Sequence, residues 1–217
     1  MARSKRSPAD TEAMRERLID AARRMIEAEG LGAVTARALA AELGWSVGSI
    51  YTIAPSIDAV TLEANARELA DLSAAFEARR AELGAAGATP ALMLRAFAEI
   101  YLRFATARPR SWAAIFERDA EGEPPEWYRG LQTRLFALLA ETVRPAVRSN
   151  AEARRAARTL WAALHGLLAL SLAGHLDRVT KADRDEAATS AAAAAEEDLE
   201  SHAFEMIDVY LNGLAQR

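Results

Sequence analysis

The chain has 217 residues, of which 51% are hydrophobic and 27% charged, so it is long enough for one large folded domain or two small ones. It contains no cysteine, which excludes disulfide bonds and thiolate metal sites. The formal net charge is −4, but this charge is unevenly distributed.

The amino-terminal part of the chain is more basic than the remainder. Residues 1–60 carry eight basic and eight acidic side chains, so the remainder carries the whole net charge of −4. Arg3, Lys5 and Arg6 form a basic tip, and we expect a polyanion to meet this end of the chain. No apolar stretch follows the tip as it would in a secretory signal, so we predict a cytoplasmic protein.

Apolar residues recur at helical spacing along the chain, and a strand pattern is almost absent. Glycines and prolines interrupt this pattern at intervals and separate the helices. The predicted helices cover residues 11–29, 35–43, 46–52, 56–83, 90–107, 110–119, 125–144, 150–174 and 196–215. We therefore predict an all-α fold, with a small three-helix domain in residues 1–55 and a larger helical domain in residues 56–217.

Two interpretations compete for the segment around Ser46. Gly44, Ser46 and Gly48 match G-x-S-x-G, the nucleophile elbow of serine hydrolases. An elbow follows a strand, whereas residues 36–43 (ARALAAEL) are good helix formers and poor strand formers. A serine esterase using Ser46 therefore stays the weaker alternative.

The other interpretation is a helix-turn-helix, in which Gly44 makes the corner and Ser46 caps the second helix. Small residues at the start of that helix would let it approach the DNA backbone closely, and Val47 could pack on a thymine methyl group. The predicted DNA-contacting residues, including the basic tip, are Arg3, Lys5, Arg6, Thr35, Arg37, Ser46, Val47, Gly48, Ser49, Tyr51 and Thr52.

Residues 15–63 resemble the DNA-binding domain of the TetR family of transcriptional repressors. The positions that carry the resemblance are Ile19, Ala21, Ala22, Glu29, Gly30, Val34, Thr35, Leu39, Ala40, Gly44, Ser46, Gly48, Ser49, Ile50, Tyr51, Pro55 and Ser56. The resemblance implies that residues 1–55 bind DNA and that residues 56–217 bind an effector and dimerise.

The sequence departs from the family pattern at two positions. Ala54 stands where the family usually has an aromatic residue, and Ile57 stands where it usually has a lysine that touches phosphate. One phosphate contact fewer would lower the affinity for DNA, and the basic tip could compensate as an arm along a groove. The same departures leave open an all-helical interaction protein with weakened DNA binding.

The family resemblance implies a homodimer that forms through the last two long helices. Residues 159–176 contain no formal charge, and we interpret them as a buried helix of an assembly rather than as a membrane span. The small residues expected to permit close helix packing are Ala156, Ala157, Gly166, Ala169 and Ala173. Core helices of a monomer are the alternative. A dimer would read a palindrome whose half-sites are about 34–36 Å apart.

The resemblance also implies an effector pocket in the larger domain. The predicted ligand-binding residues are Phe97, Tyr101, Phe104, Trp112, Phe116, Trp127, Trp161 and His165, with Tyr128 and Phe136 as further aromatic candidates. Trp161-x-x-x-His165-Gly166 resembles a signature of one carboxy-terminal subgroup of the family. Aromatic residues at helical spacing are also typical of a protein core, and a buried histidine with a satisfied ring is an equal alternative for His165.

The sequence predicts neither a metal site nor a cofactor. The three histidines lack the spacing of a metal motif, and no glycine-rich phosphate loop is present. An enzyme is therefore disfavoured. Together with the resemblance, these observations predict a transcriptional repressor that a small apolar or aromatic effector releases from a palindromic double-stranded DNA operator, without a membrane partner.

Overall fold

The computed structural model describes residues 7–116, 123–175 and 191–216. Helices make up nearly all of these residues, and no strand occurs among them, which confirms the predicted all-α fold. The chain divides into two compact units. The first contains Met1–Asp71 and Arg108–Arg129, and the second contains Leu72–Ala107 and Gly130–Arg217.

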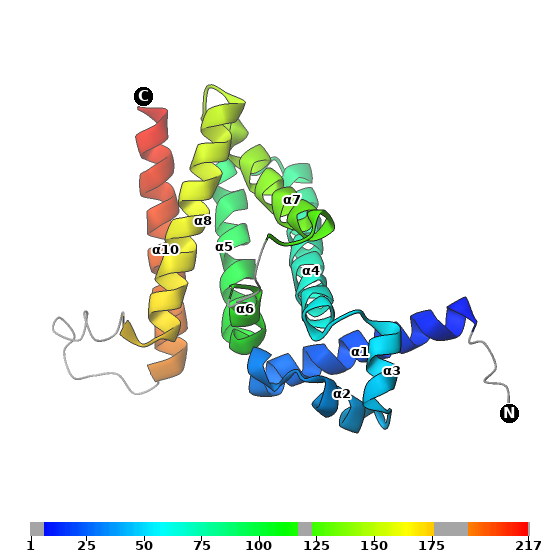
Figure 1. Ribbon diagram of the computed structural model, residues 1–217. Coiled ribbons are helices and arrows are strands. Elements are labelled where there is room, and N and C mark those ends of the chain that lie inside the picture. The colour runs from blue at the N-terminus through cyan, green and yellow to red at the C-terminus, as the bar shows by residue number, and fades with distance from the viewer. Residues whose placement is uncertain (1–6, 117–122, 176–190, 217) are drawn as a thin grey trace, which may run out of the picture. The chain divides into compact units, whose positions relative to one another are not determined.

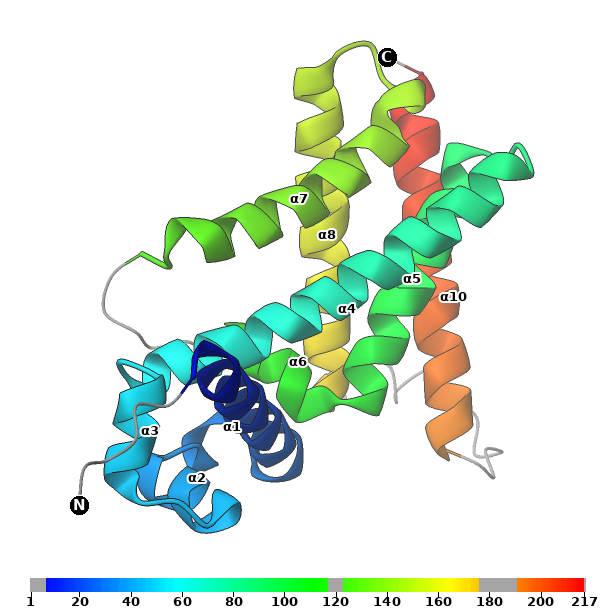
Figure 2. The same ribbon diagram turned by 90° about the vertical axis from the view of Figure 1, so that its right-hand side faces the viewer.

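The first unit is built around the predicted helix-turn-helix. Its elements are α1 (Pro8–Glu29), the 3-10 turn η1 (Leu31–Ala33), α2 (Ala36–Leu43), α3 (Val47–Ile53), the first part of α4 (Ile57–Ala85) and α6 (Pro109–Phe116). Helices α1, α2 and α3 pack against one another, as Figure 1 and Figure 2 show.

Helix α1 begins three residues earlier than the predicted range because the chain supplies a complete amino-terminal cap. The Ser7 side chain accepts a hydrogen bond from the Asp10 amide at 3.1 Å, and the Asp10 carboxylate accepts one from the Ser7 amide at 3.2 Å. Pro8 occupies the first turn, where a missing N–H costs nothing. The hydrogen bonds to Ser7 also hold the pKa of Asp10 below its ordinary value.

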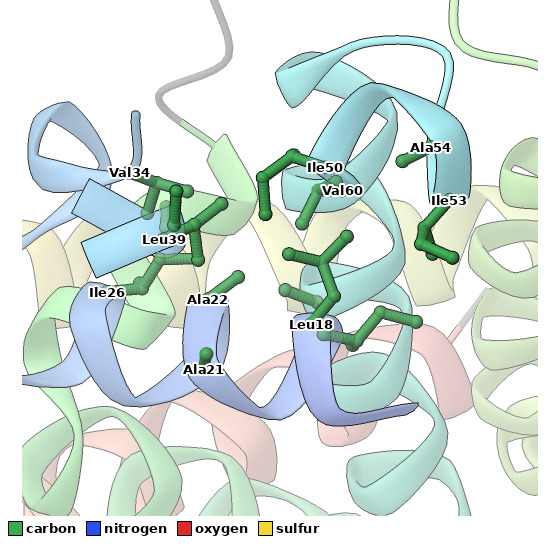
Figure 3. Close-up of a cluster of buried hydrophobic side chains, with 14 residues drawn as sticks. Leu18, Ala21, Ala22, Ile26, Val34, Leu39, Ile50, Ile53, Ala54 and Val60 are labelled. Atoms are coloured by element: carbon green, nitrogen blue, oxygen red, sulfur yellow. The ribbon is translucent and has the colours of Figure 1, made fainter. Parts of the chain in front are cut away.

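The core of the first unit lies between α1, α2, α3 and the start of α4. Leu18, Leu39 and Ile50 are fully buried, and Val60 of α4 closes the cluster. Figure 3 shows these side chains pointing towards one another from the four helices. The burial of the apolar faces of α2 and α3 is what holds these two short helices, because isolated helices of seven or eight residues are not stable in water.

Ion pairs join α1 to the first part of α4. Arg15 pairs with Glu63, and Arg67 reaches back to Glu16 at 2.6 Å. The Arg67 guanidinium lowers the pKa of the Glu16 carboxyl. These contacts hold the first part of α4 against α1.

Helix α6 also belongs to the first unit. The buried Asn65 side chain of α4 donates a hydrogen bond of 2.7 Å to the carbonyl oxygen of Ala114 in α6. The buried carboxylate of Glu68 lies 2.9 Å from both Arg23 of α1 and Arg108, which precedes α6. The unit therefore brings together segments that are far apart in the sequence.

The second unit consists of the end of α4 together with α5 (Pro90–Ala107), α7 (Glu126–Val143, from Gly130 on), the 3-10 turn η2 (Arg144–Ala146), α8 (Asn150–Leu172) and α10 (Ala191–Ala215). Helix α10 packs on both α5 and α8, and the two views of the ribbon show α8 and α10 side by side (Figure 1, Figure 2). Arg95 of α5 pairs with Asp208 of α10.

The last helix begins at Ala191 rather than at the predicted residue 196. The prediction was wrong here because it treated the alanine run as a connection, although alanine has the highest helix propensity of all residues. No helix in the described part of the chain is long and apolar enough to cross a bilayer. The uncharged run at 159–176 lies mostly in α8, and its last residue is outside the described residues.

The predicted domain boundary between residues 55 and 56 stays a prediction, and the structure adds a second division, the boundary between the compact units. It falls inside α4, after Asp71, and residues 108–129 join the first unit. The physical reason is the set of buried contacts that Asn65 and Glu68 make, which tie the start of α4 to α1 and α6. The predicted boundary follows the limits of the DNA-binding motif instead.

Candidate nucleic-acid interface and effector cavity

The corner between α2 and α3 forms at Gly44, as the helix-turn-helix interpretation requires. Gly44 has φ 68° and ψ 31°, a left-handed conformation that is costly for residues with a side chain. The Trp45 amide then donates to the Ala40 carbonyl at 2.8 Å, which satisfies the end of α2. At the other end of α2, the Thr35 side chain caps the helix by accepting from the Ala38 amide.

Local hydrogen bonds hold the start of α3. The Ser46 hydroxyl accepts from the Ser49 amide at 3.2 Å, and the two serine hydroxyls lie 2.8 Å apart. The Thr52 hydroxyl donates to the Gly48 carbonyl at 2.9 Å. A Cβ built on Gly48 would meet only the Ser46 Oγ at 3.9 Å, so this face of α3 is open.

The outer face of α3 carries large exposed side chains. Val47 is 42% exposed and Tyr51 is 53% exposed, while Ile50 and Ile53 of the same helix are buried in the core. Solvent also reaches Thr35 and Arg37 at the start of α2. Arg3, Lys5 and Arg6 of the predicted tip lie outside the described residues.

The nucleophile-elbow interpretation of Ser46 has no support in the geometry. Helix α2 precedes Gly44 where an elbow needs a strand, and the Ser46 hydroxyl serves as a helix cap.

The residues at the two departures from the family pattern both belong to, or pack against, the core of the first unit. Ala54 is buried at the end of α3, and Ile57 packs on the same hydrophobic cluster at the start of α4. Both residues therefore contribute apolar side chains to the core of the first unit.

The second unit contains an apolar cavity of about 50 Å³, enough space for a few water molecules. It lies among α4, α5, α7, α8 and α10, and no charged side chain lines it. The lining residues are Phe76, Leu94, Phe97, Ala98, Tyr101, Leu135, Phe136, Leu139, Leu160, Trp161, Leu164, Met206 and Ile207. A ligand inside it would meet aromatic rings on several sides.

Aromatic contacts order the walls of this cavity. Phe76 stacks on Phe97, and the Phe136 ring meets the Trp161 ring edge-on with the centroids 5.2 Å apart. The Tyr101 hydroxyl lies 2.8 Å from Nδ1 of His165, whose ring stacks on Trp161. Burial lowers the pKa of His165 below its ordinary value of 6.5, so the neutral ring is favoured.

The structure brings together only some of the predicted ligand-binding residues. Phe97, Tyr101 and Trp161 line the cavity, and so does the further candidate Phe136. His165 does not line it but contacts two residues that do.

Four other predicted ligand-binding residues do not line this cavity. Phe104 is buried elsewhere along α5. Trp112, Phe116 and Trp127, like the further candidate Tyr128, belong to the first unit, where Trp112 is buried and Phe116 and Trp127 are 40% and 49% exposed.

The sequence prediction missed the cavity's aliphatic walls and Phe76. Phe76 follows the buried Leu69 and Leu72 at helical spacing on α4, which was a usable signal.

Parts of the surfaces of α8 and α10 are apolar and exposed. Leu170 and Leu172 of α8 are 50% and 42% exposed, and Val209 of α10 is 66% exposed. Ala173 is also exposed, whereas Ala156 and Ala157, which we expected to permit close helix packing, are buried within the chain.

A capped helix-turn-helix with an open second helix, in a chain that also has a helical unit with an apolar cavity, defines a DNA-binding transcription regulator with a ligand-binding domain. The model of the tetR family of bacterial regulatory proteins matches residues 18–64, and the model of the tetracyclin repressor-like C-terminal domain matches residues 94–195. The chain belongs to the TetR family.

Solved structures agree with this fold. A protein with unknown function from Rhodococcus sp. RHA1 has a TM-score of 0.72 at 21% identity, over 93% of this chain and 95% of that chain. A possible TetR family transcriptional regulator from Streptomyces coelicolor A3(2) has a TM-score of 0.63 at 17% identity, over 94% of this chain and 100% of that chain.

A third structure, of a protein from Saccharomonospora viridis in complex with choline, has a TM-score of 0.62 at 23% identity, over 91% of this chain and 96% of that chain. At these identities the likeness extends to the fold alone. No curated protein matches the sequence significantly.

Proposed function

We propose that this regulator is a homodimeric repressor that a small, neutral apolar or aromatic effector releases from a palindromic operator. The observation that carries the proposal is the presence, in one chain, of an open α3 face and a separate cavity without charged lining residues. We also propose a cytoplasmic location, because the regulator must reach DNA.

The proposed operator contacts lie on α3 and at the start of α2. Val47 and Tyr51 are the most exposed large side chains of α3, so both are accessible to a duplex. Arg37 has the chemistry to bind a guanine edge or a phosphate. The proposed set comprises Arg3, Lys5, Arg6, Thr35, Arg37, Ser46, Val47, Gly48, Ser49, Tyr51 and Thr52.

The proposed effector is neutral because the cavity offers no counter-ion. Burying an unpaired charge costs far more than burying an apolar group. Aromatic rings can also hold a quaternary ammonium group by cation–π attraction, and the structural relative from Saccharomonospora viridis was solved with choline. Choline is therefore the informative comparison ligand, and a neutral aromatic compound is the expected one.

The proposed dimer forms through α8 and α10, the last two described helices of the second unit. Their exposed residues Leu170, Leu172 and Val209 support an apolar interface. Dimerisation would give two reading helices and explain recognition of a palindrome.

The proposed response is a shift between two states of the dimer. An effector that fits the cavity better in one state favours that state by its difference in affinity. Helix α4 is the proposed lever, because its first part belongs to the first unit and Phe76, in its second part, lines the cavity. We propose no catalytic activity, since Ser46 acts as a helix cap.

A cavity-filling variant tests this proposal. In Ala98→Val, two added methyl carbons occupy space in the cavity, whereas Ala75→Val adds the same group at an exposed position of α4. Bound duplex is measured by fluorescence anisotropy while small neutral aromatic compounds, and choline separately, are titrated. We expect a neutral compound to release the wild type and Ala75→Val, and Ala98→Val to need a higher concentration.

Release by choline and not by any neutral compound would contradict the proposed effector class. An equal response of Ala98→Val and Ala75→Val would contradict the proposed location of the site.

A further inference from the structure

Most of the described arginines of the first unit are held by polar contacts within that unit. Among its described arginines, those with a carboxylate or backbone carbonyl partner are Arg15, Arg23, Arg24, Arg67, Arg108, Arg110 and Arg129. Arg17 and Arg37 are the two without such a partner, and solvent reaches both. Arg37 is already among the proposed operator contacts, whereas Arg17 has no assigned role.

Arg17 lies next to the corner of the helix-turn-helix. Its guanidinium carbon lies 5.3 Å from the centroid of the Trp45 ring, a cation–π contact. Trp45 directly precedes Ser46, the cap of α3, and packs partly on the core of the first unit. The neighbouring α1 residues Arg15 and Glu16 instead face α4 through their ion pairs.

A guanidinium held over a ring keeps its N–H donors free at the edge of its plane. The ring restricts the side chain beforehand, so less rotamer entropy is lost when a further partner binds. The acidic side chain of the helix-turn-helix motif does not cancel the positive charge of the Arg17 guanidinium. Glu42 is the sole acidic residue in 30–57, and Arg24 binds it at 2.7 Å.

We propose that Arg17, positioned on the Trp45 ring, binds a phosphate of the operator backbone beside the groove that α3 enters. This inference rests on the proposed operator binding and adds a contact from α1 and the corner of the motif. The contact is independent of base sequence. It also supplies a phosphate-binding cation to a motif in which Ile57 has replaced the family's usual lysine.

The test compares Arg17→Gln and Arg17→Lys with Arg134→Gln. Arg134 is an exposed arginine of α7 in the second unit, so its substitution gives the same change in net charge. The affinity for the upstream duplex and for a scrambled duplex is measured by fluorescence anisotropy at several salt concentrations. Circular dichroism melting checks that each variant is folded.

We expect Arg17→Gln to reduce the slope of log K against log salt concentration by about 0.9 for each bound subunit. The affinity at 0.15 M salt should fall about five-fold for each bound subunit, equally for both duplexes. Arg17→Lys should keep the slope because it keeps the charge, and Arg134→Gln should leave slope and affinity unchanged.

An unchanged slope in a folded Arg17→Gln variant overturns the proposed contact, even if the affinity falls, because Arg17 would then act only through the position of Trp45. If the wild type binds neither duplex, the proposed function fails and this inference fails with it. If the wild type binds the upstream duplex and only the slope prediction fails, operator binding stands without the Arg17 contact.

Discussion

Ser46 shows how one side chain can suggest two unrelated functions. Its hydroxyl satisfies the Ser49 amide at the start of α3 and lies beside the Ser49 hydroxyl. These bonds make it a structural group in the free protein. The position of α3 relative to the corner at Gly44 depends on this cap.

Replacing Ser46 therefore tests its structural role. Ser46→Ala removes the cap, and we expect the free energy of unfolding to fall by about 1 kcal/mol. Ser46→Asn keeps a capping oxygen and should lie within a few tenths of a kcal/mol of the wild type. Urea denaturation followed by circular dichroism measures both, and equal losses in the two variants would argue against the cap.

His165 makes the stability of the second unit depend on pH. Burial lowers its pKa in the folded chain, so the unfolded chain takes up the proton first as the pH falls. The stability gained by the neutral ring is complete above 6.5, the ordinary pKa, and is lost as the pH falls through the folded pKa.

We therefore expect the melting temperature of the wild type to fall between pH 7 and pH 5 by more than that of His165→Gln. His175→Gln, at an exposed position, should behave like the wild type and serves as the control. Differential scanning fluorimetry across this range measures the difference. A parallel pH dependence of the wild type and His165→Gln would contradict the assignment.

At the scale of elements, α6 is held to the DNA-binding unit by a buried polar contact. Asn65→Ala would leave the Ala114 carbonyl without its 2.7 Å donor and open a small space. We expect a loss of about 1–3 kcal/mol in the free energy of unfolding. Asn212→Ala, on the exposed face of α10, should cost little. Chemical denaturation compares the two, and equal stabilities would show that the contact contributes nothing.

The elements themselves could largely be predicted from local signals. Thr35, Gly44, Ser46 and Ser56 marked helix ends that the structure contains, because caps and left-handed glycines act within a few residues. The start of α1 was missed although Ser7, Pro8 and Asp10 form the same kind of signal.

The candidate cavity was predicted less completely than the helices. Helical spacing shows which side chains are buried, but it does not show which of two units buries them. Trp112 and Tyr101 were both predicted to lie on helices and to bind the ligand, yet Trp112 packs in the first unit and Tyr101 lines the cavity of the second. Trp112 belongs to the first unit because α6 packs on α1, a long-range contact that local sequence patterns do not show.

At the scale of the whole molecule, the proposed dimer makes a direct prediction. Leu170→Glu would bury a carboxylate in the proposed α8–α10 interface, and we expect it to convert a dimer into a monomer. Leu92→Glu, on α5, changes a residue of similar exposure, 48% against 50%, and should leave the dimer intact. Light scattering after size exclusion measures the mass against the 23.5 kDa of one chain. A wild-type mass of one chain would contradict the proposed dimer.

The central claim is that α3 reads a specific DNA sequence, and competition binding measures this most directly. A labelled duplex from the region upstream of the protein's own gene is competed with unlabelled copies of itself and with a scrambled duplex of equal length, at 0.15 M salt. We predict that the upstream duplex competes at least about 10³-fold more effectively, the range of specific over non-specific binding. Equal competition by the two duplexes would contradict the account.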